Sequence, residues 1–398
     1  MKRISAKWAI LVALLAACIP LSGQQTSANP STTAPAAPAA TDPSSSVPTK
    51  PAEKTVATSS STAAAPKVET PAASVPASAP PGIDPKTGKP LYLTIKENWA
   101  SLSVKGSELE PEPPLVGEID EEANFTRTLV SLKWRPGDPL DVYVVVPKGV
   151  TKPPAVLYLY GYQEDTDRFK DNRWCERVTS GGVAAVGFVS AMTGHRFHDR
   201  PMKQWFVSEL QESLGSTVHD IHFILDYLNT RGDIDMNRIG MFGQGSGGTI
   251  AILAAAADPR IKTIDLLEPW GDWPVWLAKS SVVQEDPEKN RYTKADFLKK
   301  VAPLDPVKWL PTLTSTKIRM QQVADNDSNP PEVQRRLRLV APKRATVDRF
   351  DSTAQMTTVE GGGRLFNWIK DQVAKAPPEK PRRISLAKTS TAKTNTQR

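Results

Sequence analysis

Between residues 82 and 374, short apolar runs alternate with segments of helical periodicity. Runs that are apolar throughout and bounded by turn residues are typical of strands covered on both faces, whereas amphipathic helices carry an apolar stripe. The predicted strands are 128–134, 140–146, 155–160, 183–189, 239–242, 261–267, 317–323 and 345–350. The predicted helices are 171–179, 210–228, one that begins at Ser246, 331–339 and 359–373. This alternation predicts a single α/β domain over 82–374, with a mostly parallel twisted sheet and helices on both faces.

The first residues have the composition of an export signal. Three basic residues among the first seven precede the apolar run 8–18, which is too short for a stable spanning helix. Two cleavage schemes remain open, with an uncleaved anchor helix as the alternative to both. A signal peptidase would cut after Gly23, so that 1–23 is the signal, or a lipoprotein signal would end at residue 17 and Cys18 would carry the lipid. Both predict export from a bacterial cytoplasm to the periplasm, cell envelope or medium, and the second adds a membrane tether.

Two further segments are predicted to be disordered. Residues 24–81 contain no aromatic residue and consist mainly of Ala, Pro, Ser and Thr, so they cannot bury enough apolar surface to offset the entropy of ordering. Residues 375–398 form a tail with seven basic residues and one acidic residue. The formal charge of +7 therefore belongs to the two ends of the chain. A domain without a net basic balance argues against a nucleic-acid partner.

Cysteine and histidine are both scarce. If the cysteine of the leader is removed or lipidated, Cys175 is the remaining thiol, and its place in a predicted helix favours a small core residue. The four histidines form two pairs with the same spacing, His195/His198 and His219/His222. Two histidines one helical turn apart can share a metal, but a partly buried structural histidine is the expected role of His222. We predict neither a metal nor a cofactor.

A glycine-rich segment follows the strand predicted at 239–242. It contains Gly243-Gln244-Gly245-Ser246-Gly247-Gly248, and an apolar helix comes directly after it. This strand, tight turn and helix resemble the nucleophile elbow G-x-S-x-G of α/β-hydrolases. The resemblance is closest to the branch with prolyl-oligopeptidase-like peptidases, acetyl-xylan-esterase-like and dienelactone-hydrolase-like enzymes, and it spans most of 140–373. It implies an α/β-hydrolase fold and a relation to serine hydrolases of ester or peptide bonds.

The register of the elbow decides which residue holds the place of the nucleophile. Gly243 and Gly247 match the two framing glycines, so that place falls on Gly245, which has no hydroxyl. Ser246 lies one residue too late, and moving it into register would turn the side chains of the strand to opposite faces. Gly248 matches the additional glycine of this branch and favours the same register. Glycine also accepts the strained backbone of an elbow freely.

The resemblance implies places for the catalytic acid and base as well. Asp327, four residues before Pro331, matches the acid, with Asp325 as second choice; an aspartate here can instead cap the following helix. The base should lie in the loop 351–356, where Gln355 stands in place of a histidine. Glutamine accepts no proton near neutral pH. These positions predict a hydrolase fold without a working triad.

Two further groups resemble ligand-contacting parts of this family. The motif Tyr160-Gly161-Tyr162 matches the oxyanion loop, whose backbone N–H donors do not depend on the side chains; a plain strand-end turn is an equal alternative. The insertion between residues 267 and 317 is rich in aromatic residues, among them Trp270 and Trp273. It resembles a cap over a cleft that binds sugars or aryl esters, and packing of the insertion against the sheet is the alternative.

Three functional hypotheses follow. The first is an exported, non-catalytic protein that binds a small-molecule, ester or carbohydrate ligand, or a partner, through the former cleft. The second is an active esterase or peptidase with Ser246 as nucleophile and His195 or His198 as base. The third is a purely structural module of the cell envelope. The sequence makes no prediction of the oligomeric state.

Overall fold

The computed structural model describes residues 84–88, 95–162, 164–191, 193, 196, 206–284, 286–361 and 363–377. These residues belong to one compact unit. The predicted signal, the spacer 24–81 and the tail beyond residue 377 lie outside the described residues, as do His195 and His198. In the described ranges no helix combines the length and apolar character needed to cross a membrane.

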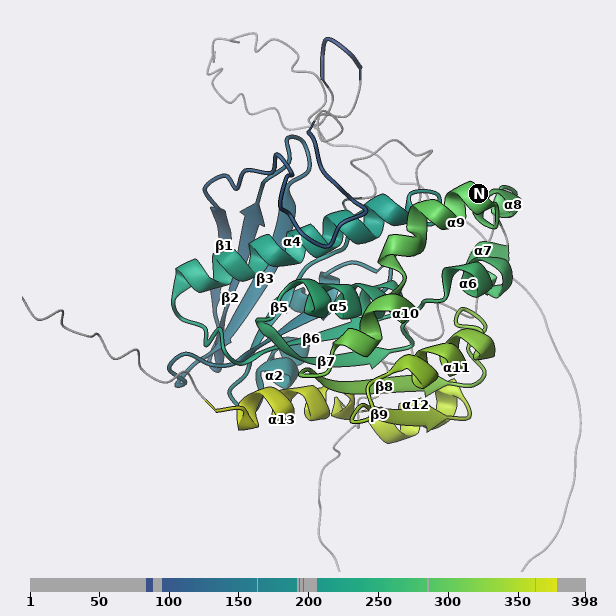
Figure 1. Ribbon diagram of the computed structural model, residues 1–398. Coiled ribbons are helices and arrows are strands. Elements are labelled where there is room, and N and C mark those ends of the chain that lie inside the picture. The colour runs from purple at the N-terminus through teal and green to yellow at the C-terminus, as the bar shows by residue number, and fades with distance from the viewer. Residues whose placement is uncertain are drawn as a thin grey trace, which may run out of the picture. The chain divides into compact units, whose positions relative to one another are not determined.

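A nine-stranded sheet forms the centre of the described part, in the order β1-β2-β3-β5-β4-β6-β7-β8-β9 (Figure 1). The strands are β1 (Leu115–Glu121), β2 (Phe125–Leu132), β3 (Leu140–Pro147), β4 (Ala155–Leu159), β5 (Ala184–Gly187), β6 (Ile239–Gln244), β7 (Ile261–Leu267), β8 (Lys317–Val323) and β9 (Thr346–Phe350). All neighbours from β5 to β9 pair in parallel, and β1, β2 and β3 extend the sheet in antiparallel. The predicted mostly parallel sheet is confirmed. Strand β1 was missed because it is an almost fully exposed edge strand with no apolar alternation.

Helices cover both faces of the sheet, as predicted. On one face α4 (Leu210–Arg231) and α5 (Ser246–Ala257) pack on alternate strand residues such as Val142 and Val144 (Figure 1). On the other face α2 (Asn172–Thr179) and α13 (Asn367–Lys375) pack on the intervening residues. The other helical segments are η2 (Asp167–Lys170), α6 (Trp273–Lys279), α7 (Ser281–Gln284), α8 (Lys289–Tyr292), α9 (Ala295–Val301), η3 (Ala302–Leu304), α10 (Pro306–Trp309), η4 (Leu310–Thr312), α11 (Pro331–Val340), α12 (Thr353–Glu360) and η5 (Arg364–Phe366). Cys175 on α2 is a free, buried thiol, as expected.

The single helix predicted at 359–373 is wrong. The chain forms α12 first, then η5, and then α13. The Ser352 hydroxyl accepts a hydrogen bond from the Gln355 N–H (3.2 Å) and so starts α12 inside the segment predicted as a loop. This helix ends at Glu360, because the next residue, Gly361, has an extended backbone. Gly363, with φ = +91°, lies in the left-handed region directly before η5.

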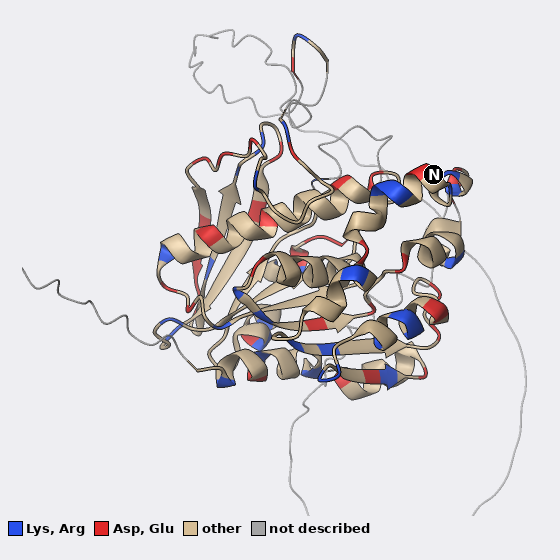
Figure 2. Ribbon diagram, in the orientation of Figure 1, with Lys and Arg blue, Asp and Glu red and all other residues tan. Residues whose placement is uncertain are grey.

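Charged residues of both signs are interspersed over the described part of the chain (Figure 2), and one group of them is buried. Arg135 donates to Glu97 (2.6 Å) and to Asp220, while Arg196 donates to Asp138 (2.6 Å) and Asp220 (2.8 Å). Burial alone would raise the pKa of Glu97, but hydrogen bonds from Arg135 and a neighbouring histidine outweigh burial and lower it to about 2. This network ties the segment before β1 to the middle of α4.

His219 completes the buried network rather than a metal site. Its Nδ1 lies 2.6 Å from Glu97 Oε1, and its Nε2 lies 3.0 Å from the Ser101 carbonyl oxygen. His222, on the same helix, is half-buried and contacts Asp258 (3.1 Å). Nowhere in the described ranges do three or more His, Cys, Asp or Glu residues gather in a way that could hold a metal ion.

We predict that Asp220→Asn lowers the free energy of unfolding by about 3–5 kcal/mol, because it leaves two buried arginines without their shared counter-ion. Urea unfolding followed by far-UV circular dichroism measures this change. Asp226→Asn is the matched control, because Asp226 lies on the same helix but is half-exposed in its pair with Arg260, and it should cost under about 1 kcal/mol. Equal losses in the two variants would contradict a structural role for the network.

Candidate functional site

The turn between β6 and α5 has the geometry of an elbow, with Gly245 at its apex. Gly245 has φ = +55° and ψ = −118°, a conformation that strains any residue with a Cβ. Its N–H donates to the Leu267 carbonyl oxygen (2.9 Å), which ties the turn to the end of β7. The structure therefore places Gly245, and not Ser246, where a nucleophile would project from an elbow.

The two framing glycines are required by close approach of the backbone. A Cβ on Gly243 would lie 2.2 Å from the Gly247 carbonyl oxygen, and a Cβ on Gly247 would lie 2.1 Å from the Leu159 carbonyl oxygen. Neither position accepts another residue without a shift of backbone atoms. The start of α5 is consequently pressed against the carboxyl ends of β4 and β6.

Ser246 is the first residue of α5 and is fully buried (0% exposed). Its Oγ accepts a hydrogen bond from the backbone N–H of Tyr162 (2.8 Å). The hydroxyl thus holds the loop after β4 in place, and Ser246 is not among the residues that line the pocket described next.

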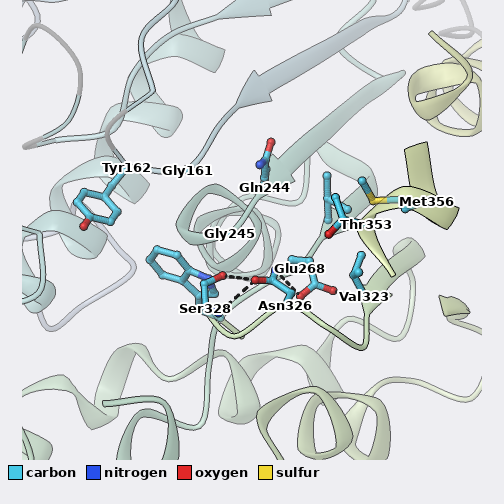
Figure 3. Close-up of a pocket in the computed structure, with 12 residues that line it drawn as sticks. Gly161, Tyr162, Gln244, Gly245, Glu268, Val323, Asn326, Ser328, Thr353 and Met356 are labelled. Carbon is cyan, nitrogen blue, oxygen red and sulfur yellow. Dashed lines mark hydrogen bonds between the residues drawn. The ribbon is translucent and has the colours of Figure 1, made fainter. Parts of the chain in front are cut away.

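A small pocket lies directly over the elbow apex (Figure 3). It has a volume of about 30 Å³, and because one water needs roughly 10–15 Å³ by this measure, it has room for only a few atoms. The loops after β4, β6, β7, β8 and β9 all contribute, since the carboxyl ends of parallel strands meet at one edge of a sheet. The lining residues are Gly161, Tyr162, Gln244, Gly245, Leu267, Glu268, Trp270, Val323, Asn326, Ser328, Thr353 and Met356.

The structure brings neither aspartate of the predicted acid loop to the pocket wall. Asp327 is exposed and accepts from the Ser281 hydroxyl (3.0 Å). It does not cap α11, which begins without a side-chain cap. Asp325 instead accepts from the N–H (3.1 Å) and the hydroxyl (3.3 Å) of Thr353. The contact between the acid loop and the loop after β9 therefore exists, but Asp325 makes it.

Gln355 does not reach the pocket either. Its side chain is exposed, and its Oε1 accepts from the Asp351 N–H (2.5 Å). Because α12 begins at Thr353, the helix turns Gln355 to solvent and presents Thr353 and Met356 to the pocket. Figure 3 shows these two residues on the same side of the pocket as Val323. The expectation that Gln355 fills the vacated place of the base has no support in this geometry.

The structure separates the residues of the predicted oxyanion loop. Gly161 and Tyr162 line the pocket, whereas Tyr160 points away from it. The Tyr160 ring packs against Phe242 (centroids 5.8 Å apart), and the Arg168 guanidinium lies 3.7 Å above the ring. Tyr160 is therefore a core residue, and a ligand would contact only the two residues that follow it.

Of the two tryptophans expected to cap a cleft, only Trp270 reaches the pocket. Trp270 and Trp273 are both 1% exposed. Trp276 lies between them, stacked on Trp270 (4.6 Å between centroids) and edge-on to Trp273 (5.7 Å). These aromatic residues thus pack the insertion into the body of the protein. This packing was the alternative to the predicted cap over a cleft.

Glu268 is a site residue that the sequence prediction missed. It follows β7 with φ = +52°, which is strained for a residue with a Cβ. Its carboxylate accepts from the Val323 N–H and from the side-chain amides of Asn326 (2.9 Å) and Asn329 (3.2 Å). Burial raises the pKa of Glu268 to about 8 and outweighs these hydrogen bonds, which lower it. The available signal was a charged residue directly after an apolar strand, at the edge where ligands bind.

Comparison with known proteins gives one relative in sequence. A protein of Bacillus subtilis (strain 168) named "Putative hydrolase YtaP" is 30% identical over an alignment of 168 residues, which covers 37% of this chain. The chain spans about half the length (54%) of this curated relative. No protein-family model matches the chain.

Two solved structures are similar to this chain. An acetyl xylan esterase from Paenibacillus sp. R4 has a TM-score of 0.52 and 17% identity, over 66% of this chain and 89% of that one. For acetyl xylan esterase 1 from Thermoanaerobacterium sp. JW/SL YS485, the TM-score is 0.48 and the identity 14%, over 62% and 84%. Together with the strand order and the elbow, the first likeness shows that this protein has the α/β-hydrolase fold.

We predict that Gly247→Ala and Gly245→Ala differ sharply in stability. The Gly247 substitution drives a Cβ into a backbone oxygen, so we expect a loss above about 4 kcal/mol or no folded protein. The Gly245 substitution meets only the edge of Trp270 at 3.3 Å, so its cost is the backbone strain of about 1–3 kcal/mol. Chemical unfolding of purified variants tests this order, and the reverse order would contradict the elbow geometry.

Glu268 should make stability depend on pH. Because its pKa rises on folding from 4.5 to about 8, the folded state binds the extra proton between these values, and its contribution to stability falls as pH rises through this window. In the Glu268→Gln variant, this contribution to the decrease of the unfolding free energy with pH should disappear. Urea midpoints at pH 5, 6, 7, 8 and 9 measure it, with exposed Glu332→Gln as the control that keeps the decrease. A constant difference between wild type and Glu268→Gln would show that Glu268 ionises normally.

Proposed function

We propose that this protein is an exported, non-catalytic member of the α/β-hydrolase fold that binds a small ligand in the pocket over Gly245. The observation that carries the proposal is the elbow itself. Its apex has the strained backbone that presents a nucleophile, but the residue there is glycine and supplies no oxygen. Acyl transfer through a covalent serine ester cannot begin at such a position.

The residues around the apex support the same proposal. None of the described residues that line the pocket is a histidine. Thr353 and Met356 contribute from the loop after β9, and neither of their side chains can serve as a general base near neutral pH. In a serine protease, loss of the nucleophile or of the base alone costs on the order of a million-fold in rate.

The pocket favours a ligand-binding protein over a purely structural module. It is lined by the loops after five strands at the carboxyl edge of the sheet, and it remains open over the apex. Its volume of about 30 Å³ suits a small molecule better than a sugar ring. The export signal predicted at the start of the chain supports a location outside the cytoplasm, with Cys18 as the proposed lipid anchor in one of the two cleavage schemes.

The alternative function is an active esterase or peptidase that uses Ser246. It would require the buried Ser246 hydroxyl to leave the Tyr162 N–H and turn into the pocket. It would also require a base, for which the sequence offers His195 and His198. The hydrogen bond of Ser246 is the observation against this alternative, because it gives the hydroxyl a structural partner.

We predict that the purified protein does not turn over p-nitrophenyl acetate above the buffer rate and that a fluorophosphonate probe does not label it. Intact-protein mass spectrometry after probe treatment, followed by peptide mapping, provides the measurement. Ser246→Ala is the matched control and should behave like wild type in both assays. Labelling at Ser246 that disappears in Ser246→Ala, together with ester turnover, would refute the proposal and establish the alternative.

A further inference from the structure

The indole N–H of Trp270 is a buried donor beside the elbow. Trp270 is 1% exposed and lines the pocket, and its Nε1 has no hydrogen-bond partner in the described part of the chain. A buried donor without a partner destabilises the folded state, because it has lost its hydrogen bond to water. Such a group in a binding pocket marks a position where a ligand acceptor would restore the lost hydrogen bond.

The position of this donor relative to Gly245 identifies the space where the acceptor would lie. A Cβ placed on Gly245 would be 3.3 Å from Trp270 Cζ2 and 3.6 Å from Nε1. The space between the two residues is thus the one that the side chain of a nucleophile would occupy. A small adjustment brings an oxygen there within the ordinary N–H···O distance of about 2.7–3.2 Å.

The start of α5 adds a second attraction for an acceptor. This helix has 12 residues and begins at Ser246, directly after the apex. The first N–H groups of a helix have no partner within the helix, and its N-terminus carries a partial positive charge. Both effects favour an oxygen with partial negative charge over a cationic group.

The charge of the pocket wall limits the ligand further. None of the described lining residues is a lysine, an arginine or a histidine, and the wall contains the carboxyl group of Glu268. An anionic ligand would therefore be buried without a counter-ion, beside an acidic group, which is costly. Leu267, Val323 and Met356 supply the apolar part of the wall.

We propose that the pocket binds a small uncharged molecule with a short apolar body and one carbonyl oxygen, such as a short-chain amide. The carbonyl oxygen accepts from the indole N–H of Trp270 in the space that Gly245 leaves open, and the apolar body packs on Leu267, Val323 and Met356. This inference rests on the proposed ligand-binding function and names the ligand class and the residue that recognises it.

Nitrogen-15 labelling of the tryptophan side chains allows a direct test by NMR. Titration of the full-length protein with propionamide should move one indole N–H resonance to a saturating shift. That resonance should be absent from the spectrum of Trp270→Phe. Trp273→Phe is the matched control, because the Trp273 N–H is also buried without a partner among the described residues but does not line the pocket. It should keep the full titration.

A charged ligand and a variant of Gly245 test the proposal further. Propionate has nearly the same size as propionamide but is charged, and it should give no saturating shift at the same concentrations. Gly245→Ala should abolish the response to propionamide, because its methyl group occupies the acceptor space; circular dichroism and thermal unfolding check that this variant is folded.

The proposal would be overturned if no indole resonance of the wild-type protein saturates, if propionate binds as well as propionamide, or if the response survives in folded Gly245→Ala. These outcomes are separate from those for the proposed function. Probe labelling of Ser246 would refute the non-catalytic function, whether or not the Trp270 indole resonance shifts with propionamide. If the probe does not label the protein and the Trp270 indole resonance does not shift, only the proposed ligand class is refuted.

Discussion

The rest of the structure depends on the close approach of α5 to the ends of β4 and β6. Only hydrogen fits at Gly243 and Gly247, because a Cβ at either position would lie about 2 Å from a backbone oxygen. This approach sets the angle at which the chain leaves β6, and the angle forces the strained conformation of Gly245. Five loops converge over that apex because the parallel strands all end at this edge of the sheet.

The same constraint explains why the elbow keeps its shape with glycine at the apex. Packing of the helix against the sheet requires the framing glycines whatever residue stands between them, and glycine at the apex relieves the strain of the turn. Around it, the serine of the elbow and an aspartate of the loop after β8 have hydrogen-bond partners within the protein. Ser246 binds the loop after β4, and Asp325 binds the loop after β9. The site is thus held together by hydrogen bonds that also leave a small open space over Gly245.

Predictions from local pattern were reliable where local physics decides the outcome. The boundaries predicted for β7 and β8 agree with the structure, because buried parallel strands are continuous apolar runs bounded by turns. The structure places neither Gln355 nor Tyr160 in the pocket wall. The helix that starts at the Ser352 cap turns Gln355 to solvent, and Tyr160 packs in the core on one face of the sheet. Strand β1 carries no such signal, because an exposed edge strand buries almost nothing.

The order of apolar runs in the sequence by itself determined a mostly parallel α/β sheet, and the resemblance of the glycine-rich segment to a nucleophile elbow added the α/β-hydrolase fold and the place of Gly245 at the apex. Only the tertiary structure decided that Glu268 and Trp270 line the pocket and that the Ser246 hydroxyl faces the Tyr162 N–H. The hydrogen bond between Ser246 and Tyr162 joins residues 84 positions apart. Contacts of this kind depend on how separate loops meet at the edge of the sheet. No periodic pattern of apolar and polar residues in the sequence indicates such an arrangement.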